Sequence, residues 1–512
     1  QVFALVGTAE HMPIRWRRLQ RRCAAQGCLA AFALKLGDLH CSASAVLRPG
    51  YPELHAEVFG AVGDGETDST AAFEAALARL RRAGGGALVV PEGVFRVAPL
   101  RLSSRTTLFL QRGATLQAID DASRWEVVGP LESYGHGREG TRRGRRTAFL
   151  SGEGLSDVVI TGEWGTIDGN AWRWWEARWG AEKDFFDGVT LPHLVEFRHT
   201  QGLEISHVRL VNSPLWTVHP FACRGVVVRD VEIENPESVP NTDGVNPDSC
   251  EDVLIEDIVY SGGDDAVSLK SGWDCFGDWR GFNRPTRNVI IRNMTVRTTG
   301  IAAAIAIGSE MSGGVEDVLA EDVRIERAGP SGGAFVVKSA GTRGGFVRNI
   351  TIRRLEVGNI PGPALVVVHP NGFGSNPACA SQRLSAPPEI SGITFEDVRQ
   401  IEGTTVGEPP VFFGAPDWLE GPEVEGYSGS PSRELAPKRV SGISLVRVGL
   451  VTDAGLGPEP VPWRGFPACG GGVEVALGDG VSFSGRLEPG PWFGKVAGGE
   501  SCGVRMMKEA CL

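Results

Sequence analysis

Apolar residues recur between residues 203 and 448 in groups of similar pattern, separated by polar turns. Within each group the apolar positions alternate with a period of two, which is typical of strands and not of helices. The groups are Leu203–Leu210, Val226–Ile233, Val253–Tyr260, Val289–Val296, Val318–Ile325, Ile350–Val357 and the weaker Ile393–Val398 and Ile443–Val448. Their first members are 23, 27, 36, 29, 32, 43 and 50 residues apart. A common template with uneven insertions predicts a solenoid in which each coil contributes a pair of short strands.

Strands that repeat in one direction every 23 to 30 residues are expected to build an all-β, right-handed parallel β-helix. A β-sandwich is the competing architecture, but it would join its strands by hairpin turns. Asn-Gly occurs only at Asn371-Gly372, and the one Asp-Gly that clearly separates two alternating runs is Asp479-Gly480. The sequence therefore favours the β-helix.

One short helix is predicted near the start of the solenoid, where we expect it to cap the N-terminal end. Asp68-Ser69-Thr70 is a plausible N-cap, and Gly84-Gly85-Gly86 follows the last helical residue. Between them, residues 71–83 carry an apolar face with helical spacing. Its members are Ala72, Phe73, Ala76, Leu77 and Leu80. Short strands are expected after it, at Ala87–Val90, Thr106–Leu110 and Thr115–Gln117.

The pattern divides the chain into three parts. Residues 1–50 are an N-terminal extension in which the apolar run Cys23–Leu36, displaced from the start, resembles a degraded signal peptide. Residues 51–455 are the expected β-helix domain, with a Pro- and Gly-rich loop insertion at 403–437. Residues 456–512 form a tail with three cysteines, which is expected to cover the C-terminal end of the solenoid. These cysteines are Cys469, Cys502 and Cys511.

Composition limits the possible partners. The chain of 512 residues has a hydrophobic content of 42% and a net charge of −11, which argues against nucleic acid or an anionic membrane as a main partner. No apolar run approaches the roughly 20 residues that span a membrane. The ten cysteines include no C-x-x-C pair that would indicate zinc. Two glycosylation sequons, at Asn293 and Asn349, are compatible with secretion. We expect a secreted monomer without metal or cofactor.

Three carboxylates stand out between residues 235 and 272: Asp243 and the adjacent pair Asp264-Asp265. Asp264 follows Asp243 by 21 residues, which is about one coil of the predicted solenoid. Because stacked coils lie ~4.8 Å apart, Asp243 is expected beside Asp264 or Asp265. Gly262-Gly263 allows a bend at which both members of the pair turn toward a cleft.

Clustered carboxylates suit glycoside hydrolysis. In an inverting enzyme a protonated carboxyl donates to the leaving oxygen while a second carboxylate, ~6.5–9.5 Å away, activates water. Crowding three acids raises at least one pKa, which keeps one acid protonated. A calcium site or a solvated turn is the alternative interpretation of the same residues.

Longer motifs surround these aspartates and recur elsewhere in order. They are Thr166-Ile167-Asp168-Gly169, Asn212–Pro220, Asn241-Thr242-Asp243-Gly244, Gly263-Asp264-Asp265, Ser271–Asp274, Gly308–Gly314 and Val337-Lys338-Ser339. From about residue 54 to 450 the chain resembles the polygalacturonase family, glycoside hydrolase family 28, and in particular its plant and bacterial branch. The resemblance implies a pectin lyase-like solenoid that hydrolyses α-1,4 bonds between galacturonic acid units of pectin, with inversion, outside the cell and in cell walls.

Carried over by motif, the resemblance implies a role for each acidic residue. Asp264 would be the general acid, and Asp243 and Asp265 would hold and activate the water. Lys338 would bind a sugar carboxylate near the cleavage point.

Two departures from the family pattern leave the preferred substrate open. Gly308-Ser309-Glu310 stands where many members have Gly-His-Gly, and Val336-Val337-Lys338 stands where many have Arg-Ile-Lys. Loss of that arginine removes a bidentate carboxylate clamp, which Arg343 could partly replace.

Other residues have two interpretations each. His219 could face the cleft or be a structural histidine within a coil. Lys270 could line the cleft or neutralise the local acidity. Trp174 and Trp175 could stack on sugar rings or pack under a loop. Glu310 is either a cleft carboxylate or a turn residue.

Two alternative functions stay open. A pectate lyase shares the β-helix architecture but needs calcium-binding acids and an arginine base, and no arginine is clearly partnered with these acids in the sequence. A non-catalytic pectin-binding β-helix is favoured by the missing histidine and arginine. Exo or endo action, and galacturonan or rhamnogalacturonan as substrate, are not specified by the motifs.

Overall fold

The computed structural model describes most of the chain from residue 51 to residue 451 and three short strands beyond it. The described residues are 51–135, 144–179, 189–273, 282–330, 332–339, 343–367, 388–408, 440–451, 474–477, 482–484 and 505–508. The expected N-terminal extension, most of the expected insertion at 403–437 and the tail cysteines lie outside them.

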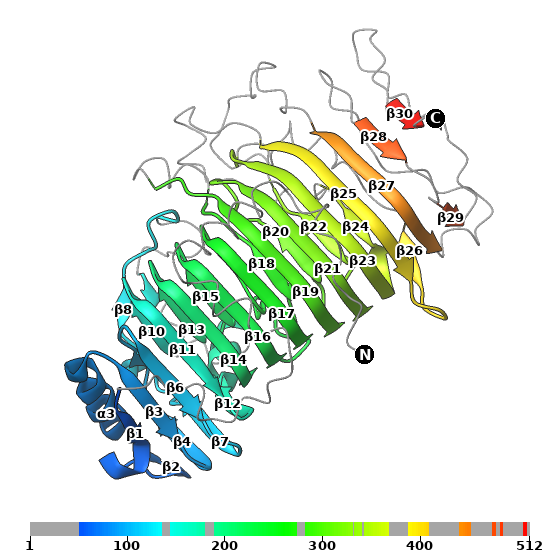
Figure 1. Ribbon diagram of the computed structural model, residues 1–512. Coiled ribbons are helices and arrows are strands. Elements are labelled where there is room, and N and C mark those ends of the chain that lie inside the picture. The colour runs from blue at the N-terminus through cyan, green and yellow to red at the C-terminus, as the bar shows by residue number, and fades with distance from the viewer. Residues whose placement is uncertain are drawn as a thin grey trace, which may run out of the picture. The chain divides into compact units, whose positions relative to one another are not determined.

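Parallel strands stacked in register make up the body of the fold (Figure 1). In the described part of the chain, 20 strands join into one sheet. The long strands are β11 (Ser156–Gly162), β14 (Gln201–Val211), β16 (Arg224–Glu234), β17 (Glu251–Ser261), β19 (Thr286–Thr298), β21 (Val315–Arg327), β23 (Phe346–Pro363), β25 (Glu389–Gln400) and β27 (Val440–Val451). The shorter ones are β1 (Glu53–His55), β2 (Asp64–Asp68), β3 (Gly86–Val90), β4 (Gly93–Val97), β6 (Thr106–Leu110), β7 (Ala114–Ala118), β12 (Gly165–Asp168), β26 (Val406–Glu408), β28 (Glu474–Leu477), β29 (Ser482–Ser484) and β30 (Arg505–Lys508). The predicted parallel β-helix is confirmed.

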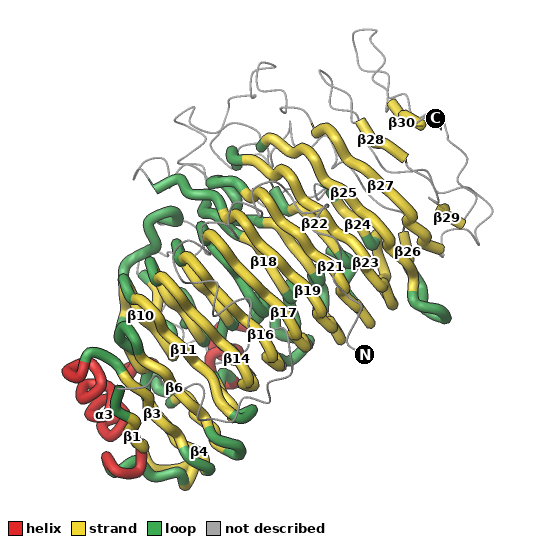
Figure 2. Tube along the Cα trace, in the orientation of Figure 1, coloured by secondary structure: helices red, strands yellow, loops and turns green. Residues whose placement is uncertain are grey.

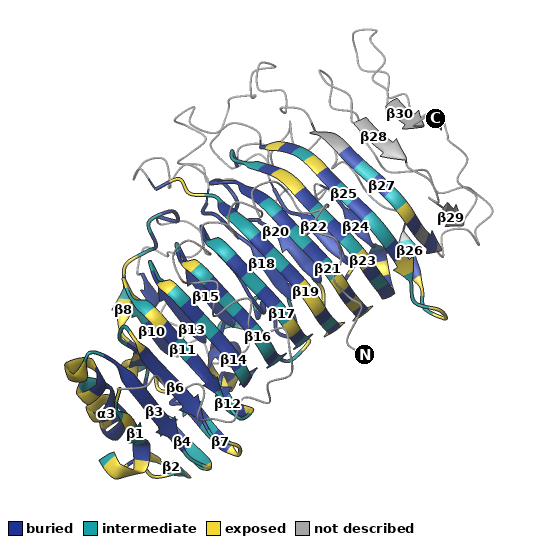
Figure 3. Cartoon of the chain, in the orientation of Figure 1, coloured by how far each residue is buried: buried dark blue, intermediate teal, exposed yellow. Residues whose placement is uncertain are grey.

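The register of the long strands follows the apolar pattern of the sequence. Leu203 pairs with Val226, which pairs with Val253 on the next coil. The same column continues through Val289, Val318, Ile350, Ile393 and Ile443. Buried and solvent-facing positions therefore alternate along each strand and align from coil to coil (Figure 3). Because apolar residues stack on apolar residues of the adjacent coils, one continuous apolar core forms inside the solenoid.

Each predicted pair of short strands is one bent strand in the structure. The bend is a single residue with positive φ, such as Asp230 (φ 51°), Asp257 (φ 55°) or Asn293 (φ 50°). Asp and Asn tolerate this left-handed conformation better than most residues. Because the bend falls at equivalent positions of successive coils, the chain turns a corner without losing parallel pairing on either side. The sequence marks this corner only as a polar residue between two apolar pairs.

A second, narrower face of short strands lies across the core from part of the long strands. It consists of β5 (Leu100–Arg101), β10 (Leu150–Glu153), β13 (Val195–Arg198) and β15 (Val218–Phe221), and of β18 (Val267–Leu269), β20 (Ile305–Ile307), β22 (Phe335–Val337) and β24 (Leu365–Val366). Residues 245–248 bridge the two groups, because Val245 pairs in parallel with both Val218 and Val267. We call this continuous surface the short-strand face.

Helix α3 (Thr70–Ala83) is the predicted N-terminal helix, and it lies beside the first coils (Figures 1 and 2). Its apolar face packs into the core through Phe73, Leu77 and Leu80. Ser69 is the N-cap residue, but its side chain makes no capping bond. The carboxylate of Asp68 instead accepts the Thr70 backbone N–H at 2.9 Å, so the first residue of the expected Asp68-Ser69-Thr70 cap makes the capping bond.

The remaining elements are small. They are the 3₁₀ turns η3 (Ala56–Phe59) and η4 (Ala122–Arg124), helix α4 (Trp172–Trp179) and the antiparallel pair β8 (Val127–Val128) and β9 (Arg145–Arg146). Strand β26, inside the expected insertion at 403–437, pairs with β23. Strands β28 and β29 pair with β27, within the expected tail. No helix among the described residues combines the length and apolarity that a membrane crossing requires.

Replacement of a stacked core residue should destabilise the solenoid. Ile255 is fully buried between Val228 and Ile291 of the adjacent coils, so Ile255→Ala should cost about 2–5 kcal/mol through lost burial and a cavity. Urea unfolding monitored by circular dichroism measures the loss. Leu254→Ala, on the partly exposed side of the same strand, is the matched control. An equal loss in both variants would contradict the stacked-core account.

Candidate active site

Two neighbouring coils of the short-strand face bring the three aspartates together. Val245 pairs with Val267, so one coil here is 22 residues long, one more than the interval from Asp243 to Asp264. The backbone N–H of Gly244 donates to the carbonyl of Asp265 at 2.9 Å. Asp265, and not Asp264, therefore occupies the position equivalent to Asp243 on the next coil. Both residues are 2% exposed.

Asp264 is the partly exposed member of the three. Its Oδ2 accepts the backbone N–H of Asn241 at 2.8 Å, and its Oδ1 accepts the N–H of Asp265 at 2.9 Å. The hydroxyl of Tyr260 donates to its carbonyl oxygen at 2.8 Å. These bonds fix the turn after Gly262-Gly263 and hold the carboxylate at the rim of the buried pair.

The three carboxylates form a tight cluster. One oxygen from each of Asp243, Asp264 and Asp265 lies within 4.8 Å of the other two. Burial raises the pKa of Asp243 well above its ordinary value, and the charge of Asp264 adds to this effect. Burial likewise raises the pKa of Asp265, although Lys338 opposes the shift. At mildly acidic pH the cluster therefore retains a proton, which is the property that an acid catalyst needs.

Lys338 lies against the cluster. Its Nζ donates to both oxygens of Asp265, at 2.8 and 2.6 Å, and the residue is 9% exposed. Burial by itself lowers the pKa of Lys338, but the charge of Asp265 reverses the shift and the pKa is raised. The ammonium is thus held charged at the edge of the site.

Lys270 and Glu310 form a second buried ion pair next to Asp243. Lys270 Nζ lies 2.9 Å from Glu310 Oε2 and 3.5 Å from Asp243 Oδ2. It also lies 4.1 Å from the centroid of the Trp216 ring, a cation–π contact. Burial opposes the charge of Lys270, but Glu310 and Asp243 outweigh it and raise its pKa. Of the two interpretations of Lys270, this geometry favours neutralisation of the local acidity.

His219 lies inside the wall of the site and has no exposed surface. Its Nδ1 is 3.2 Å from Glu196 Oε2 and its Nε2 is 3.4 Å from Asp248 Oδ2. Burial disfavours the imidazolium, but bonds to Asp248 and Glu196 raise the pKa of His219 to about 9. Burial lowers the pKa of the adjoining His193 to about 4. This burial favours the structural interpretation of His219.

Three further candidates are also buried. Arg343 is 1% exposed, and its guanidinium carbon lies 3.6 Å from the centroid of the Trp273 ring. A sugar carboxylate would reach that guanidinium only if neighbouring groups moved. Trp174 and Trp175 are 1% and 5% exposed, and Trp174 packs edge-on against Trp125. Of the two interpretations of these tryptophans, this burial favours packing over stacking on sugar rings.

A cation could bridge the three carboxylates by distance alone. However, the ammonium of Lys338 already lies on both oxygens of Asp265, and Lys270 lies beside Asp243. Two protein cations therefore already balance part of the negative charge that would attract a divalent ion. The donor set fits acid–base chemistry better than metal coordination.

Sequence reasoning missed three contacts that surround the site. Lys270 forms an ion pair with Glu310 and a cation–π contact with Trp216, and Asp248 pairs with Lys270 on the adjacent coil. The sequence did contain a signal for the pairing of Asp248 with Lys270. Asp243 to Asp248 and Asp265 to Lys270 have equal spacing, and the structure pairs Asp248 with Lys270. Aligning the two coils on their aspartates would have placed these side chains next to each other. Nothing in the sequence indicates the contact between Lys270 and Trp216.

The fold and the cluster define a parallel β-helix that carries a group of three carboxylates and two lysines. Residues 85–411 match the family model described as glycosyl hydrolases family 28. A probable polygalacturonase from Vitis vinifera is 39% identical over 343 residues, 66% of this chain and 67% of that protein. An endo-polygalacturonase from Pectobacterium carotovorum is 27% identical over 61% of this chain and 73% of its own length. The chain belongs to glycosyl hydrolases family 28.

Solved structures agree on the fold. The exopolygalacturonase from Thermotoga maritima superimposes with a TM-score of 0.60 at 24% identity, over 84% of this chain and 93% of that one. The polygalacturonase from Erwinia carotovora gives a TM-score of 0.57 at 19% identity, over 86% and 95% of the two chains.

The protonated His219 should make stability depend on pH. Its folded pKa of about 9 lies above the value near 6.5 expected in the unfolded chain. Its contribution is therefore complete below about pH 6.5 and lost as pH rises through about 9. Urea unfolding should show a drop of the order of 1–3 kcal/mol between about pH 6 and 9.5. The drop should be absent in His219→Gln and present in His207→Gln, which changes a half-exposed histidine. Equal pH dependence in all three proteins would contradict a buried imidazolium.

Proposed function

We propose that the protein cleaves α-1,4-galacturonosyl bonds of polygalacturonan, the backbone of pectin, by acid–base hydrolysis at the cluster of Asp243, Asp264 and Asp265. Membership of family 28 and the polygalacturonase relatives support hydrolysis of this polymer. The observation that carries the proposal is the position of the three carboxylates, which lie within 4.8 Å of one another beside a buried lysine on each side.

Asp264 is the proposed general acid. It is the partly exposed carboxyl of the cluster, so it can reach a glycosidic oxygen without rearrangement of the coil. The raised pKa values of Asp243 and Asp265 keep a proton in the cluster for transfer to the leaving group.

Asp243 and Asp265 are the proposed pair that holds and activates the water. They occupy equivalent positions on adjacent coils, and each faces a cation: Lys270 lies 3.5 Å from Asp243, and Lys338 lies 2.6 Å from Asp265. Each cation opposes the rise that burial causes in the pKa of its carboxyl and so favours the ionised form, which accepts a proton from water. Lys338 also provides a positive charge for a uronate carboxylate, and Glu310 positions Lys270.

Inversion at the anomeric carbon is part of the proposal and rests on the family motifs. The carboxylate oxygens are closer together than the ~6.5–9.5 Å that is usual for inverting enzymes and nearer to the ~5–5.5 Å of retaining ones. A water held by two carboxylates of the same cluster, and not between opposed ones, would account for the short spacing. Proton NMR of the first product resolves this point, because an α-linkage yields a β-anomer on inversion.

An extracellular, cell-wall location and a monomeric state complete the proposal. The polysaccharide substrate implied by the family supports the location, because such a polymer is met outside the cell. Size-exclusion chromatography with light scattering measures the oligomeric state directly.

Loss of the proposed acid should nearly abolish turnover. Wild-type protein incubated with polygalacturonate should release reducing ends without the absorbance of unsaturated products. Asp264→Asn should lower kcat by about 10²–10⁴-fold, because proton donation by a positioned acid contributes that much. Asp257→Asn, at an exposed bend of the same coil, should leave the rate unchanged. Retained activity in Asp264→Asn would assign the acid elsewhere, and calcium-dependent unsaturated products would indicate a lyase.

Substitutions in the buried ion pair should shift the pH profile in opposite directions. Lys270→Met removes the cation that stabilises ionised Asp243, so the pKa of Asp243 should rise and the acidic limb of kcat/KM should move up by roughly one unit or more. Glu310→Gln frees the charge of Lys270 for Asp243, so the same limb should move down. Measurement of kcat/KM on polygalacturonate from about pH 3 to 8 tests both. Shifts of the same sign in the two variants would exclude this coupling.

A further inference from the structure

Asn246 is a fully buried amide beside the cluster of three aspartates. Its Nδ2 donates to Oδ2 of Asp243 at 3.3 Å, and its Oδ1 accepts no hydrogen bond from the described residues. A buried amide with one polar atom left without a partner costs stability. Packing alone therefore does not explain an amide at this position, and its contact with Asp243 points to a role in the site.

The pairing of the coils holds Asn246 in place. Residues 245–248 pair in parallel with strands on both neighbouring coils, whereas Asp243 lies in the irregular segment just before them. A Cβ on Gly244 would lie 2.4 Å from the carbonyl oxygen of Ala266, so the close approach of the two coils at this point requires glycine. A donor on a paired segment thus reaches back to a carboxylate on an irregular one.

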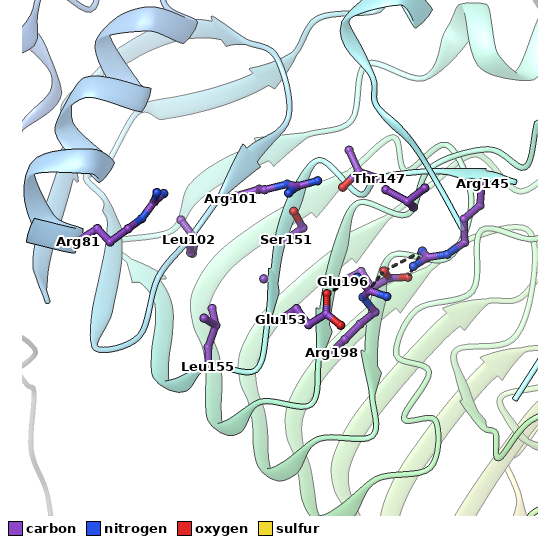
Figure 4. Close-up of a pocket in the computed structure, with 12 residues that line it drawn as sticks. Arg81, Arg101, Leu102, Arg145, Thr147, Ser151, Glu153, Leu155, Glu196 and Arg198 are labelled. Atoms are coloured by element: carbon purple, nitrogen blue, oxygen red, sulfur yellow. Dashed lines mark hydrogen bonds and ion pairs between the residues drawn. The ribbon is translucent and has the colours of Figure 1, made fainter. Parts of the chain in front are cut away.

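The preceding coil supports Asn246 from the other side. His219 of β15 occupies the position equivalent to Asn246 on that coil, and its Nδ1 lies 3.2 Å from Oε2 of Glu196. Both oxygens of Glu196 accept from Arg145, each at 2.8 Å (Figure 4). All three of these side chains are buried. This network restricts movement of Asn246 away from Asp243, so the distance between them is set by the pairing of the coils.

The two oxygens of Asp243 have different surroundings. Oδ2 lies 3.3 Å from Nδ2 of Asn246 and 3.5 Å from Nζ of Lys270. Within the part of the chain that the structure describes, no polar side chain or backbone N–H contacts Oδ1. In Asp265, by contrast, both oxygens accept from Lys338, at 2.8 and 2.6 Å. Of the two buried carboxylates, Asp243 is therefore the one with an oxygen available to a water molecule.

We propose that Asn246 is a positioning residue for the hydrolysis: together with Lys270 it holds Oδ2 of Asp243, so that Oδ1 of the same carboxylate accepts the proton of the attacking water. This inference rests on the proposed function. In the step, the water oxygen bonds to the anomeric carbon and its proton passes to Oδ1 of Asp243. The bond from the anomeric carbon to the leaving oxygen breaks as Asp264 gives its proton to that oxygen. Asn246 acts only through Asp243.

The charge of Asp243 depends on the groups that face it. Burial and the charges of neighbouring aspartates raise the pKa of Asp243, and the charges of the two lysines lower it. The ionisable groups around this carboxyl are Asp264, Asp265, Lys270, Lys338, Tyr260 and, beyond Lys270, Glu310. A hydrogen bond donated by Asn246 further stabilises the ionised form. The amide does not titrate, so it can donate to Asp243 throughout the working pH range.

Two substitutions remove the amide donor with different effects on packing. Asn246→Leu keeps the volume of the side chain, and Asn246→Ala does not. Both should lower kcat on polygalacturonate about tenfold, the effect of one hydrogen bond to a charged group, and leave KM unchanged. Both should also move the acidic limb of kcat/KM up by roughly one unit, because ionised Asp243 loses a donor.

The matched control is Asn288→Leu. It removes a similar bond, from Nδ2 of Asn288 to Oδ1 of Asp252 at 3.1 Å, on the long strands. This variant should lower stability in urea unfolding and leave the pH profile unchanged. A loss of rate without a shift of the limb in the Asn246 variants, or a shift in only one of them, would overturn the proposal.

A titration without substrate separates failure of this proposal from failure of the proposed function. Carbon-13 NMR of protein labelled at the aspartate carboxyl carbons follows the ionisation of Asp243, whose signal is assigned by its loss in Asp243→Asn. The midpoint should lie roughly one unit higher in Asn246→Leu than in wild type. If wild-type protein releases no reducing ends but the midpoint shifts, the proposed hydrolysis fails and the control of Asp243 by Asn246 stands. If reducing ends are released and the midpoints agree, Asn246 is a packing residue and this proposal fails.

Discussion

Parallel stacking of coils in register is the constraint on which the rest of the structure depends. Every coil must return to the same place ~4.8 Å further along, so corners have to fall at equivalent positions. Residues with positive φ, such as Asp230 and Asp257, provide these corners. Because the register is fixed on the long strands, it is also fixed on the short-strand face, where Val245 pairs with Val267. This pairing places Asp243 and Asp265 side by side, and no further interaction is required to explain their position.

The site concentrates buried charge that must be balanced locally. An unpaired buried ion is costly, and a pair is tolerated only when its hydrogen bonds are good. Asp265 has both oxygens on Lys338, and Lys270 lies between Asp243 and Glu310. With Asp264 included, four carboxylates lie beside two ammonium groups, so negative charge is in surplus. This surplus, together with burial, raises the pKa values of Asp243 and Asp265. Burial and the surplus of negative charge therefore both favour retention of a proton in the cluster.

The sequence predicted the fold closely because the core repeats. Each first apolar residue that the pattern selected, from Leu203 to Ile443, lies in one column of the structure. The pattern missed that each pair of short strands is one bent strand. The bend is a single residue, and in the sequence it is visible only as one polar position between two apolar pairs. The pattern also left open whether Asp264 or Asp265 stands beside Asp243, and the coil of 22 residues selects Asp265. Side-chain partners such as Glu310 and Lys270 come from different coils, and no local spacing encodes their contact.

The Gly-Ser-Glu sequence at 308–310 is better understood as part of an ion pair than as the loss of a histidine. A buried carboxylate at Glu310 requires a cation, and Lys270 supplies it at 2.9 Å. Lys270 in turn needs more than one partner to stay charged when fully buried, and Asp243 and the face of Trp216 meet that need. Glu310, Lys270 and Asp243 are therefore coupled, and a change at any one alters the charge balance of the other two. Gly-His-Gly has a glycine at the position of Glu310, and a glycine there would leave Asp243 as the nearest carboxylate of Lys270. The charge of Lys270 would then act more strongly on Asp243 and favour its ionised form at lower pH. The departure from the family pattern thus changes the charge balance beside Asp243 and leaves the cluster of three carboxylates in place.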